Sequence, residues 1–322
     1  MAISIKSFEQ ELVNTKEKSR NFPRDINFSF SATGKELRSE LTGKISKNDF
    51  RGFEPWTLAC IVEAKQKTGI DVSKVIFAVA KPQKTDRSFD LNFESFRRRL
   101  SFLSINNPAI KFELELNGNK VILDDKKALF NRPANEIIRS EISEHSEENN
   151  PKFLEKAFQS FLYGKELEIR TNERLAILGE DFYKMKGKDV GILREFPTGV
   201  FNEKIADATR IMPTEFVDLI TLNKWGNLAV LELKVDNSVL EVISQILDYG
   251  LFFACYRNLI AEIPVIKNTF NTKQIEKDDI FCYVVNNRFH LRFDGIMPFY
   301  STKNKSYGFC FRKVILGETS EI

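Results

Sequence analysis

Two runs of eight mostly apolar residues, 215–222 and 228–235, lie five residues apart in the C-terminal half of the chain. Both are rich in Val, Ile and Leu and have the length of strands. Their connection, NKWGN, contains Gly226, as a longer hairpin loop allows. The next stretch, residues 239–260, is apolar nearly all round and predicts a buried helix. The pattern therefore predicts a strand, a turn, a strand and a helix in direct succession.

The remaining apolar segments predict a mixed architecture. Strands are expected at residues 25–32, 72–82, 278–287 and 307–316, helices at 55–69, 93–103 and 171–187, and a hairpin at 109–125. Strands alternating with helices favour a mixed sheet with helices on both sides. The expected fold class is α/β (α+β), with an N-terminal mixed α+β domain and a C-terminal mixed sheet flanked by helices.

Charge divides the chain of 322 residues into three parts. Residues 1–139 hold 25 basic and 18 acidic side chains, a net charge of +7, and residues 151–322 hold 23 of each. Between them, residues 140–150 carry four Glu, no base and no periodicity, which is typical of a linker. We therefore expect a basic substrate-recognition domain, an acidic linker and a second domain.

The predicted hairpin brings charged residues together. If Leu222 pairs with Leu228, Asp218 lies directly opposite Glu232, and Lys234 shares their face because side chains alternate along a strand. Opposed carboxylates in a buried sheet repel each other unless a cation lies between them or one stays protonated. Oxygen ligands of this kind suit Mg²⁺ or Mn²⁺.

Asp218, then Glu232-Leu233-Lys234, then a helix with Gln245-x-x-x-Tyr249, resembles the PD-(D/E)XK phosphodiesterase superfamily, in particular its RecB- and NucS-like branches. The resemblance is carried by residues 215–249, is extended to about 151–316, and does not cover the first 140 residues. The chain departs from the motif in one place, since a Val and not a Pro precedes the aspartate.

The resemblance implies a restriction-endonuclease-like domain and a role for each matching residue. Asp218, Glu232 and the Leu233 carbonyl would bind the metal, Lys234 would position the nucleophile, and Gln245 would support the site. The expected activity is Mg²⁺-dependent hydrolysis of DNA, most simply as an endonuclease in defence or repair.

A short motif also occurs by chance, in which case Glu232 and Lys234 pair on a solvated face. Against that reading, both strands are apolar on both faces, and a strand buried on both sides should not carry three charges without a reason. The chain holds a comparison motif, Glu63-Ala64-Lys65, in a segment that we interpret as an ordinary helix end.

The superfamily usually adds a glutamate from a helix that precedes the hairpin. In the predicted helix 171–187, Glu173 and Glu180 are seven residues apart and share a face. Either one would complete the metal shell, or Glu195 would serve from a strand instead. For each of them, an ordinary surface position is the alternative.

Three consecutive arginines, Arg97, Arg98 and Arg99, interrupt a Phe-rich helical pattern. Successive helical residues point about 100° apart, so the three would fan across one broad face. Such a cluster holds phosphates, and the basic balance of this domain favours DNA. The alternative is a solvated helix face.

Composition excludes several classes of protein. No apolar run reaches the length of a membrane span, the N-terminus has no secretory pattern, and two His argue against a zinc site or His-based catalysis. Four separated Cys are typical of a reducing cytoplasm. DNA is the expected partner, and a homodimer is left open. The alternatives to a nuclease are a nucleic-acid-binding or sensor module on a catalytically weak scaffold, and a metal-independent regulatory protein.

Overall fold

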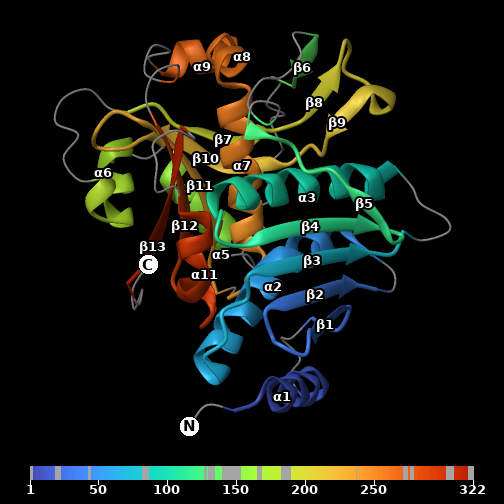
Figure 1. The fold of residues 1–322 in the computed structure, drawn as a ribbon. Coiled ribbons are helices and arrows are strands. Elements are labelled where there is room, and N and C mark those ends of the chain that lie inside the picture. The colour runs from blue at the N-terminus through green and yellow to red at the C-terminus, as the bar shows by residue number, and fades with distance from the viewer. Residues whose placement is uncertain are drawn as a thin grey trace. The chain divides into compact units, whose positions relative to one another are not determined.

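The structure is a computed structural model that describes residues 3–18, 23–42, 45–81, 87–126, 129, 135–139, 154–164, 169–182, 190–236, 238–270, 275, 279–301 and 308–317. The chain forms two compact units (Figure 1). Unit 1 comprises Met1–Leu129 and Leu291–Tyr300, and unit 2 comprises Phe130–His290 and Ser301–Ile322. Both units combine helices with mixed sheets, which confirms the predicted mixed α/β class.

The structure divides the chain differently from the predicted limits at residues 139 and 151. The strand β6 (Glu136–Ile138) pairs with β8 (Val200–Asn202) and so belongs to unit 2. The helix α11 (Phe293–Tyr300) belongs to unit 1, although the charge pattern assigned it to the second domain. Both differences come from packing between distant segments, which a composition shift does not record. The predicted acidic linker, 140–150, lies outside the described residues.

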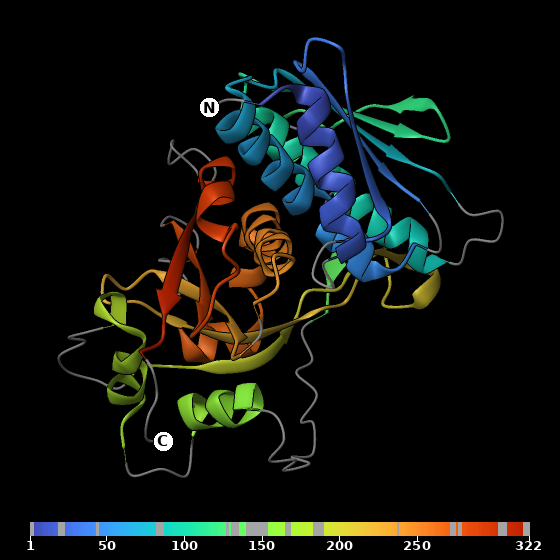
Figure 2. The same cartoon turned by 90° about the horizontal axis from the view of Figure 1, so that it is seen from below.

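Unit 1 has one five-stranded sheet in the order β1-β2-β3-β4-β5. Its strands are β1 (Ile26–Phe30), β2 (Glu36–Leu41), β3 (Lys74–Val79), β4 (Lys111–Leu116) and β5 (Asn119–Val121), and its other helices are α1 (Ile5–Lys18), α2 (Lys47–Thr68) and α3 (Arg87–Asn106). The strands β2, β3 and β4 are parallel and are connected through α2 and α3. Right-handed crossovers place both helices on one face of the sheet, as Figure 2 shows.

The helix α2 begins earlier than the predicted start at residue 55. Ser46 caps it, because its hydroxyl accepts from the Asp49 backbone N–H while the Asp49 carboxylate accepts from the Ser46 N–H. This reciprocal capping box satisfies two orphan donors, so the helix is established two turns before Pro55, which it contains. Its C-terminal end at Gly69 was predicted correctly, since Gly69 takes the left-handed conformation with a φ of 76°.

Unit 2 is built on a second five-stranded sheet, in the order β13-β12-β11-β10-β7. Its strands are β7 (Leu193–Pro197), β10 (Phe216–Leu222), β11 (Leu228–Lys234), β12 (Ile280–Asn286) and β13 (Phe309–Ile315). Its helices are α5 (Leu154–Tyr163), α6 (Thr171–Leu175), the short 3-10 turns η1 (Ala176–Leu178) and η2 (Glu180–Phe182), α7 (Val242–Cys255), α8 (Arg257–Ala261) and α9 (Pro264–Thr269). A three-stranded sheet joins β6, β8 and β9 (Arg210–Met212), with the 3-10 turn η3 (Asp207–Thr209) before β9.

Two helical layers cover the sheet of unit 2. One face packs against α5 and α6, where Phe158 and Leu162 of α5 join Leu219, Leu231 and Tyr283 in one core cluster. The helix α7 lies on the opposite face, as Figure 2 shows. The sheet is therefore buried on both faces, and the predicted 22-residue helix 239–260 is broken at Tyr256 into α7 and α8.

Candidate active site

The register of the β10–β11 hairpin is the predicted one. Leu222 pairs with Leu228, and the pairing continues regularly as far as Leu219 with Leu231. One step further, Asp218 and Glu232 are neighbours, and there the regular ladder ends. Beyond this point a side chain replaces the backbone as acceptor: the Asp218 Oδ2 accepts from the Leu233 backbone N–H at 2.7 Å. The aspartate is thus held where the two strands stop pairing.

Glu232 and Lys234 form an ion pair inside the sheet. Glu232 is 1% exposed, and its Oε1 lies 2.5 Å from the Lys234 Nζ. The same ammonium donates to the Leu233 carbonyl at 2.9 Å. Because β11 is buried, desolvation makes every charge here expensive unless it is paired. The ammonium of Lys234, the last residue of β11, is therefore paired with the Glu232 carboxylate and the Leu233 carbonyl at the end of the strand.

The helix α5 supplies two further contacts to this strand end. The Glu155 Oε1 lies 3.3 Å from the Lys234 Nζ, and the Gln159 Nε2 donates to the Asp218 carbonyl at 2.9 Å. Residues four apart on a helix lie on one face, so one side of α5 contacts both charged strands. It fixes Asp218 through its backbone and Lys234 through its charge.

The surroundings of Asp218 disfavour its charged form. Burial, and next the neighbouring Glu232 carboxylate, raise the pKa of Asp218 well above its usual range; Lys234 and the Leu233 N–H act in the opposite direction. Burial lowers the pKa of Lys234, but the surrounding carboxylates outweigh it, so that this pKa lies above its ordinary value. The surroundings therefore favour the charged form of Lys234 and the neutral form of Asp218.

Gln245 approaches the site through Tyr249, one turn further along α7. Its Nε2 donates to the Tyr249 hydroxyl at 2.9 Å, and that hydroxyl donates to the Phe216 carbonyl at 2.9 Å. Burial raises the pKa of Tyr249, and the charges of Glu232 and Asp218 raise it further, so this phenol stays neutral beside the carboxylates. Gln245 thus supports the Tyr249 hydroxyl, and that hydroxyl joins α7 to β10 at Phe216, two residues before Asp218.

The predicted upstream glutamates, Glu173 and Glu180, do not share a helix face. The expected helix 171–187 breaks at Gly179, where φ is 100°, so the two residues fall in α6 and in the separate turn η2. Both side chains are exposed. Besides Glu232, Glu155 from the upstream helix α5 reaches Lys234, and the sequence analysis missed it. A signal was present in the spacing of Glu155 and Gln159 beside the apolar Phe158 and Leu162.

Glu195, the strand alternative, lies on β7 beside Asp218. Pairing of Phe196 with Val217 and of Arg194 with Leu219 brackets it. Its φ is 52°, a left-handed conformation that few non-glycine residues adopt. The edge of the sheet is therefore locally distorted next to the aspartate, and the Glu195 side chain is partly buried.

The donor set suits a divalent cation. A partly buried and a fully buried carboxylate that repel each other supply hard oxygen ligands. Mg²⁺ keeps several waters and is commonly held by one or two carboxylates. Asp218 and Glu232 would hold the ion, with the Leu233 carbonyl beside them. Across the part of the chain that the structure describes, three or more His, Cys, Asp or Glu do not cluster in a metal-binding group.

The arginine cluster of α3 is not the exposed face that its sequence suggested. Arg99 is 1% exposed and forms an ion pair with the fully buried Glu54 of α2, while its Nη2 donates to the Phe50 carbonyl at 2.7 Å. Arg98 is buried as well. Arg97 is bound to Glu94 and to Asp124, at 2.8 and 2.7 Å. The expectation that these three arginines form a phosphate-binding face is therefore wrong: Arg99 joins α3 to α2, and Arg97 joins α3 to the segment that follows β5.

Two other expectations concern residues outside the site. The comparison motif Glu63-Ala64-Lys65 lies within α2, where Glu63 pairs with Arg292 and Lys65 with Asp71, as expected of an ordinary helix end. Cys60, Cys255, Cys282 and Cys310 are free thiols.

Comparison of the chain with protein-family models, with curated proteins and with solved structures gave no match. Within the described ranges, the helices are all too short or too polar to cross a membrane.

Proposed function

We propose that unit 2 is a metal-dependent nuclease that hydrolyses phosphodiester bonds of DNA. One observation carries the proposal: the partly buried Asp218 and the fully buried Glu232 are adjacent where two strands stop pairing, and Lys234 lies against the same strand end. The agreement between this geometry and the PD-(D/E)XK pattern supports it further.

Each residue has a distinct task in the proposed site. Asp218 and Glu232 would hold Mg²⁺ or Mn²⁺, which when bound lowers the pKa of a water and stabilises charge on the phosphoryl group. Lys234 offsets the negative charge that develops on the phosphate and orients the attacking water. Gln159 and Tyr249 hold the backbone of β10 in place on either side of Asp218.

Burial of the site explains why these charges can act strongly. An ammonium in a water-poor environment interacts with a developing negative charge far more strongly than it would in water. The surrounding carboxylates raise the pKa of Lys234 and favour its charged form. The role proposed for Lys234 is therefore electrostatic.

The wider setting follows by analogy with other nucleases. We propose a cytoplasmic enzyme that cuts within DNA strands, in defence against foreign DNA or in repair. Unit 1 would select or grip the substrate, through a surface other than its arginine cluster.

The test is a cleavage assay with plasmid, linear and single-stranded DNA in Mg²⁺, Mn²⁺ or EDTA. We expect cleavage that depends on the metal and that Asp218→Asn, Glu232→Gln and Lys234→Ala each abolish. Lys65→Ala is the matched control, because it removes the lysine of the comparison motif, whose side chain is 64% exposed.

Metal-dependent DNA binding without cleavage by the wild-type protein would instead indicate the sensor module. Cleavage that survives all three substitutions would show that the hairpin is not the active site.

A further inference from the structure

The turn of the same hairpin presents an aromatic side chain to solvent. Trp225 is 51% exposed, whereas the other tryptophan, Trp56, is 4% exposed. The turn itself is rigid, since the Asn223 Oδ1 accepts from the backbone N–H groups of both Trp225 and Asn227. Trp225 is thus a large apolar surface that is fixed in place and left partly uncovered.

Trp225 is the outer member of a row of rings. Its ring lies 5.5 Å from that of Phe281 on β12, at an interplanar angle of 30°. Phe281 is stacked with Tyr283 at 6.3 Å, and Tyr283 contacts Phe182 at 5.0 Å. The inner rings belong to the core on the α5–α6 face, so the row is supported from within.

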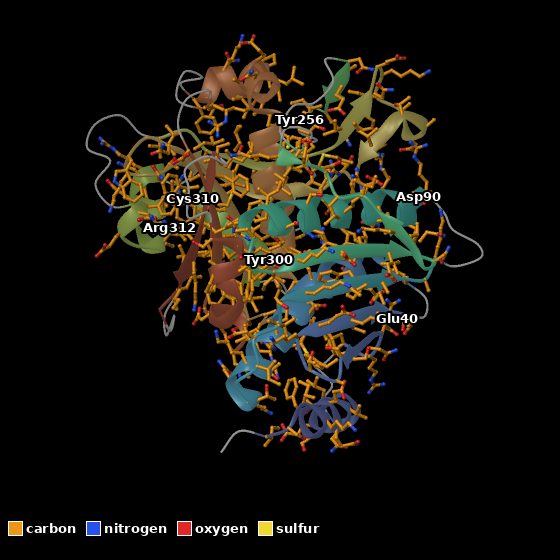
Figure 3. The ribbon with its side chains drawn as sticks, viewed as in Figure 1. Glu40, Asp90, Tyr256, Tyr300, Cys310 and Arg312 are labelled. Carbon is orange, nitrogen blue, oxygen red and sulfur yellow. The ribbon has the colours of Figure 1, made fainter. Side chains whose placement is uncertain are left out.

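Two cations flank the exposed end of this row. The Lys224 Nζ lies 4.7 Å from the centre of the Trp225 ring, and the Arg312 guanidinium lies 5.7 Å from the centre of the Phe281 ring. Arg312 is 52% exposed on β13, where Figure 3 labels it. The nearby acid is Asp181, whose Oδ2 lies 3.9 Å from the Arg312 Nε and accepts from the Tyr283 hydroxyl at 3.0 Å. Lys224 and Arg312 thus place two cations beside the outer rings of the row.

We propose that Trp225, Phe281, Lys224 and Arg312 form a stacking platform for unpaired bases of a DNA strand. Aromatic rings beside cations are the chemistry by which proteins bind single strands, since every base offers a π-face while the phosphates attract the cations. The inference rests on the proposed nuclease function and deepens it, because it assigns single-stranded DNA, or a duplex with an unpaired segment, as the substrate class.

Magnitudes favour a base over the present contact. An exposed contact between a lysine and an aromatic ring is weaker than the stacking of a base on an aromatic side chain. A base can therefore displace the Lys224 ammonium from the Trp225 ring. The released ammonium then pairs with a neighbouring phosphate.

The platform and the carboxylates lie at opposite ends of β11. Trp225 precedes the strand, and Lys234 is its last residue. Seven residues at about 3.3 Å each separate the two by roughly 20 Å or more. A DNA strand that contacts both must therefore extend across several nucleotides, so the binding of very short oligonucleotides should not depend on Trp225.

The test uses tryptophan fluorescence in EDTA, where no metal-dependent cleavage occurs. In a Trp56→Phe background the signal comes from Trp225 alone, and it is titrated with a 20-nucleotide oligo-dT, a matching oligo-U and a blunt 20-base-pair duplex. We expect the oligo-dT to quench the fluorescence strongly and the duplex to quench it weakly. Equal quenching by oligo-U would show that the platform does not distinguish the sugar, and would overturn its assignment to DNA.

Variants in the otherwise wild-type chain give a second reading by anisotropy of labelled oligo-dT. Trp225→Ala and Arg312→Ala should each weaken binding about tenfold, and Trp225→Tyr should largely restore it, because stacking needs only a ring. The matched control is Lys313→Ala, which removes a neighbouring cation that lies 4.7 Å from the Phe289 ring. Thermal melting confirms that each variant is folded.

The outcomes separate the platform from the catalytic proposal. Absence of quenching, or equal affinity in Trp225→Ala and Lys313→Ala, overturns the platform even if metal-dependent cleavage is intact. Strong quenching of Trp225 by oligo-dT, together with weaker oligo-dT binding by Trp225→Ala than by Lys313→Ala in the anisotropy measurement, upholds the platform as a single-strand site even if the protein cleaves no DNA.

Discussion

Lys234 has three oxygen partners, one each from Glu232, Leu233 and Glu155. It is not a metal ligand, so its loss should leave the two carboxylates free to bind a cation. We predict that Lys234→Ala retains Mn²⁺ binding by calorimetry while turnover falls by about 10²–10³, as is common when one charge stabiliser is lost. Because the effect belongs to the transition state, it should appear in kcat more than in KM.

A Lys234→Ala protein that cleaves DNA as fast as the wild type would remove the lysine from the mechanism. One that loses Mn²⁺ binding as well would show that the lysine organises the carboxylates, with no separate role in turnover.

Asp218 should cost the folded protein stability whenever the metal is absent. Its pKa is raised in the folded state, so the neutral form is favoured there, and stability falls as the pH rises from the ordinary value of 3.8 through the raised value. We predict that Asp218→Asn, which keeps an acceptor for the Leu233 N–H, unfolds in urea with EDTA at pH 7 with a free energy about 1 kcal/mol or more above wild type.

The gain should shrink as the pH is lowered toward 4, because the wild-type carboxyl then becomes neutral too. A constant difference across this pH range would mean that the asparagine acts through packing and not through charge.

At the scale of elements, α5 is the helix that the proposed site depends on. Glu155 and Gln159 lie on its inner face, one contacting Lys234 and the other the backbone of Asp218. We predict that Glu155→Gln lowers the rate of cleavage about tenfold or more. Glu173→Gln and Glu180→Gln are matched controls, with the same chemical change at exposed positions, and should cleave at the wild-type rate.

If Glu173→Gln or Glu180→Gln proved to be the damaging change, the contact between α5 and Lys234 would be incidental to catalysis.

A buried ion pair joins α2 to α3 in unit 1. Removing one partner of such a pair leaves an uncompensated buried charge and commonly costs about 3–5 kcal/mol. We predict this loss for Arg99→Ala, measured by urea unfolding, and a smaller loss for Arg97→Ala, because the Arg97 side chain is 21% exposed and its partner Glu94 is 44% exposed. Neither should change the salt dependence of DNA binding, because these guanidinium groups already face protein carboxylates.

If Arg97→Ala were as stable as the wild type but its DNA binding depended less on salt, Arg97 would be shown to contact DNA.

At the scale of the whole molecule, metal binding should raise the free energy of unfolding. A ligand that binds only the folded state adds about 2.7 kcal/mol at a concentration of 100 times its Kd. We predict that the Tm of the wild-type protein rises with Mn²⁺ concentration and that the Tm of Glu232→Gln does not. An equal rise in both proteins would locate the metal elsewhere.

The two units are interleaved in sequence, which limits what truncation can test. The chain leaves unit 2 after His290, forms α11 in unit 1 and returns at Ser301. The α11 segment is tied into unit 1 by the Asn106 and Asn107 side chains, which both donate to the Phe299 carbonyl. Point substitutions in the full chain are therefore the cleaner experiments.

Local geometry was predictable from the sequence because it depends on short-range rules. The length of the turn after Leu222 and the alternation of side chains set the hairpin register, and with it the neighbouring positions of Asp218 and Glu232. The left-handed end of α2 at Gly69 followed in the same way.

Which charges are buried, and by what, was decided only by the tertiary structure. Glu155 reaches Lys234 from 79 residues away, and Glu54 neutralises Arg99 from 45 residues away. The sequence marks each of these side chains as charged, but the free energy of a charge depends on its distance from opposite charges and from water. Those distances come from packing between segments that are remote in the chain. The sequence by itself therefore determined the hairpin, and only the fold decided that α5 serves the candidate site and that the arginines of α3 serve the core.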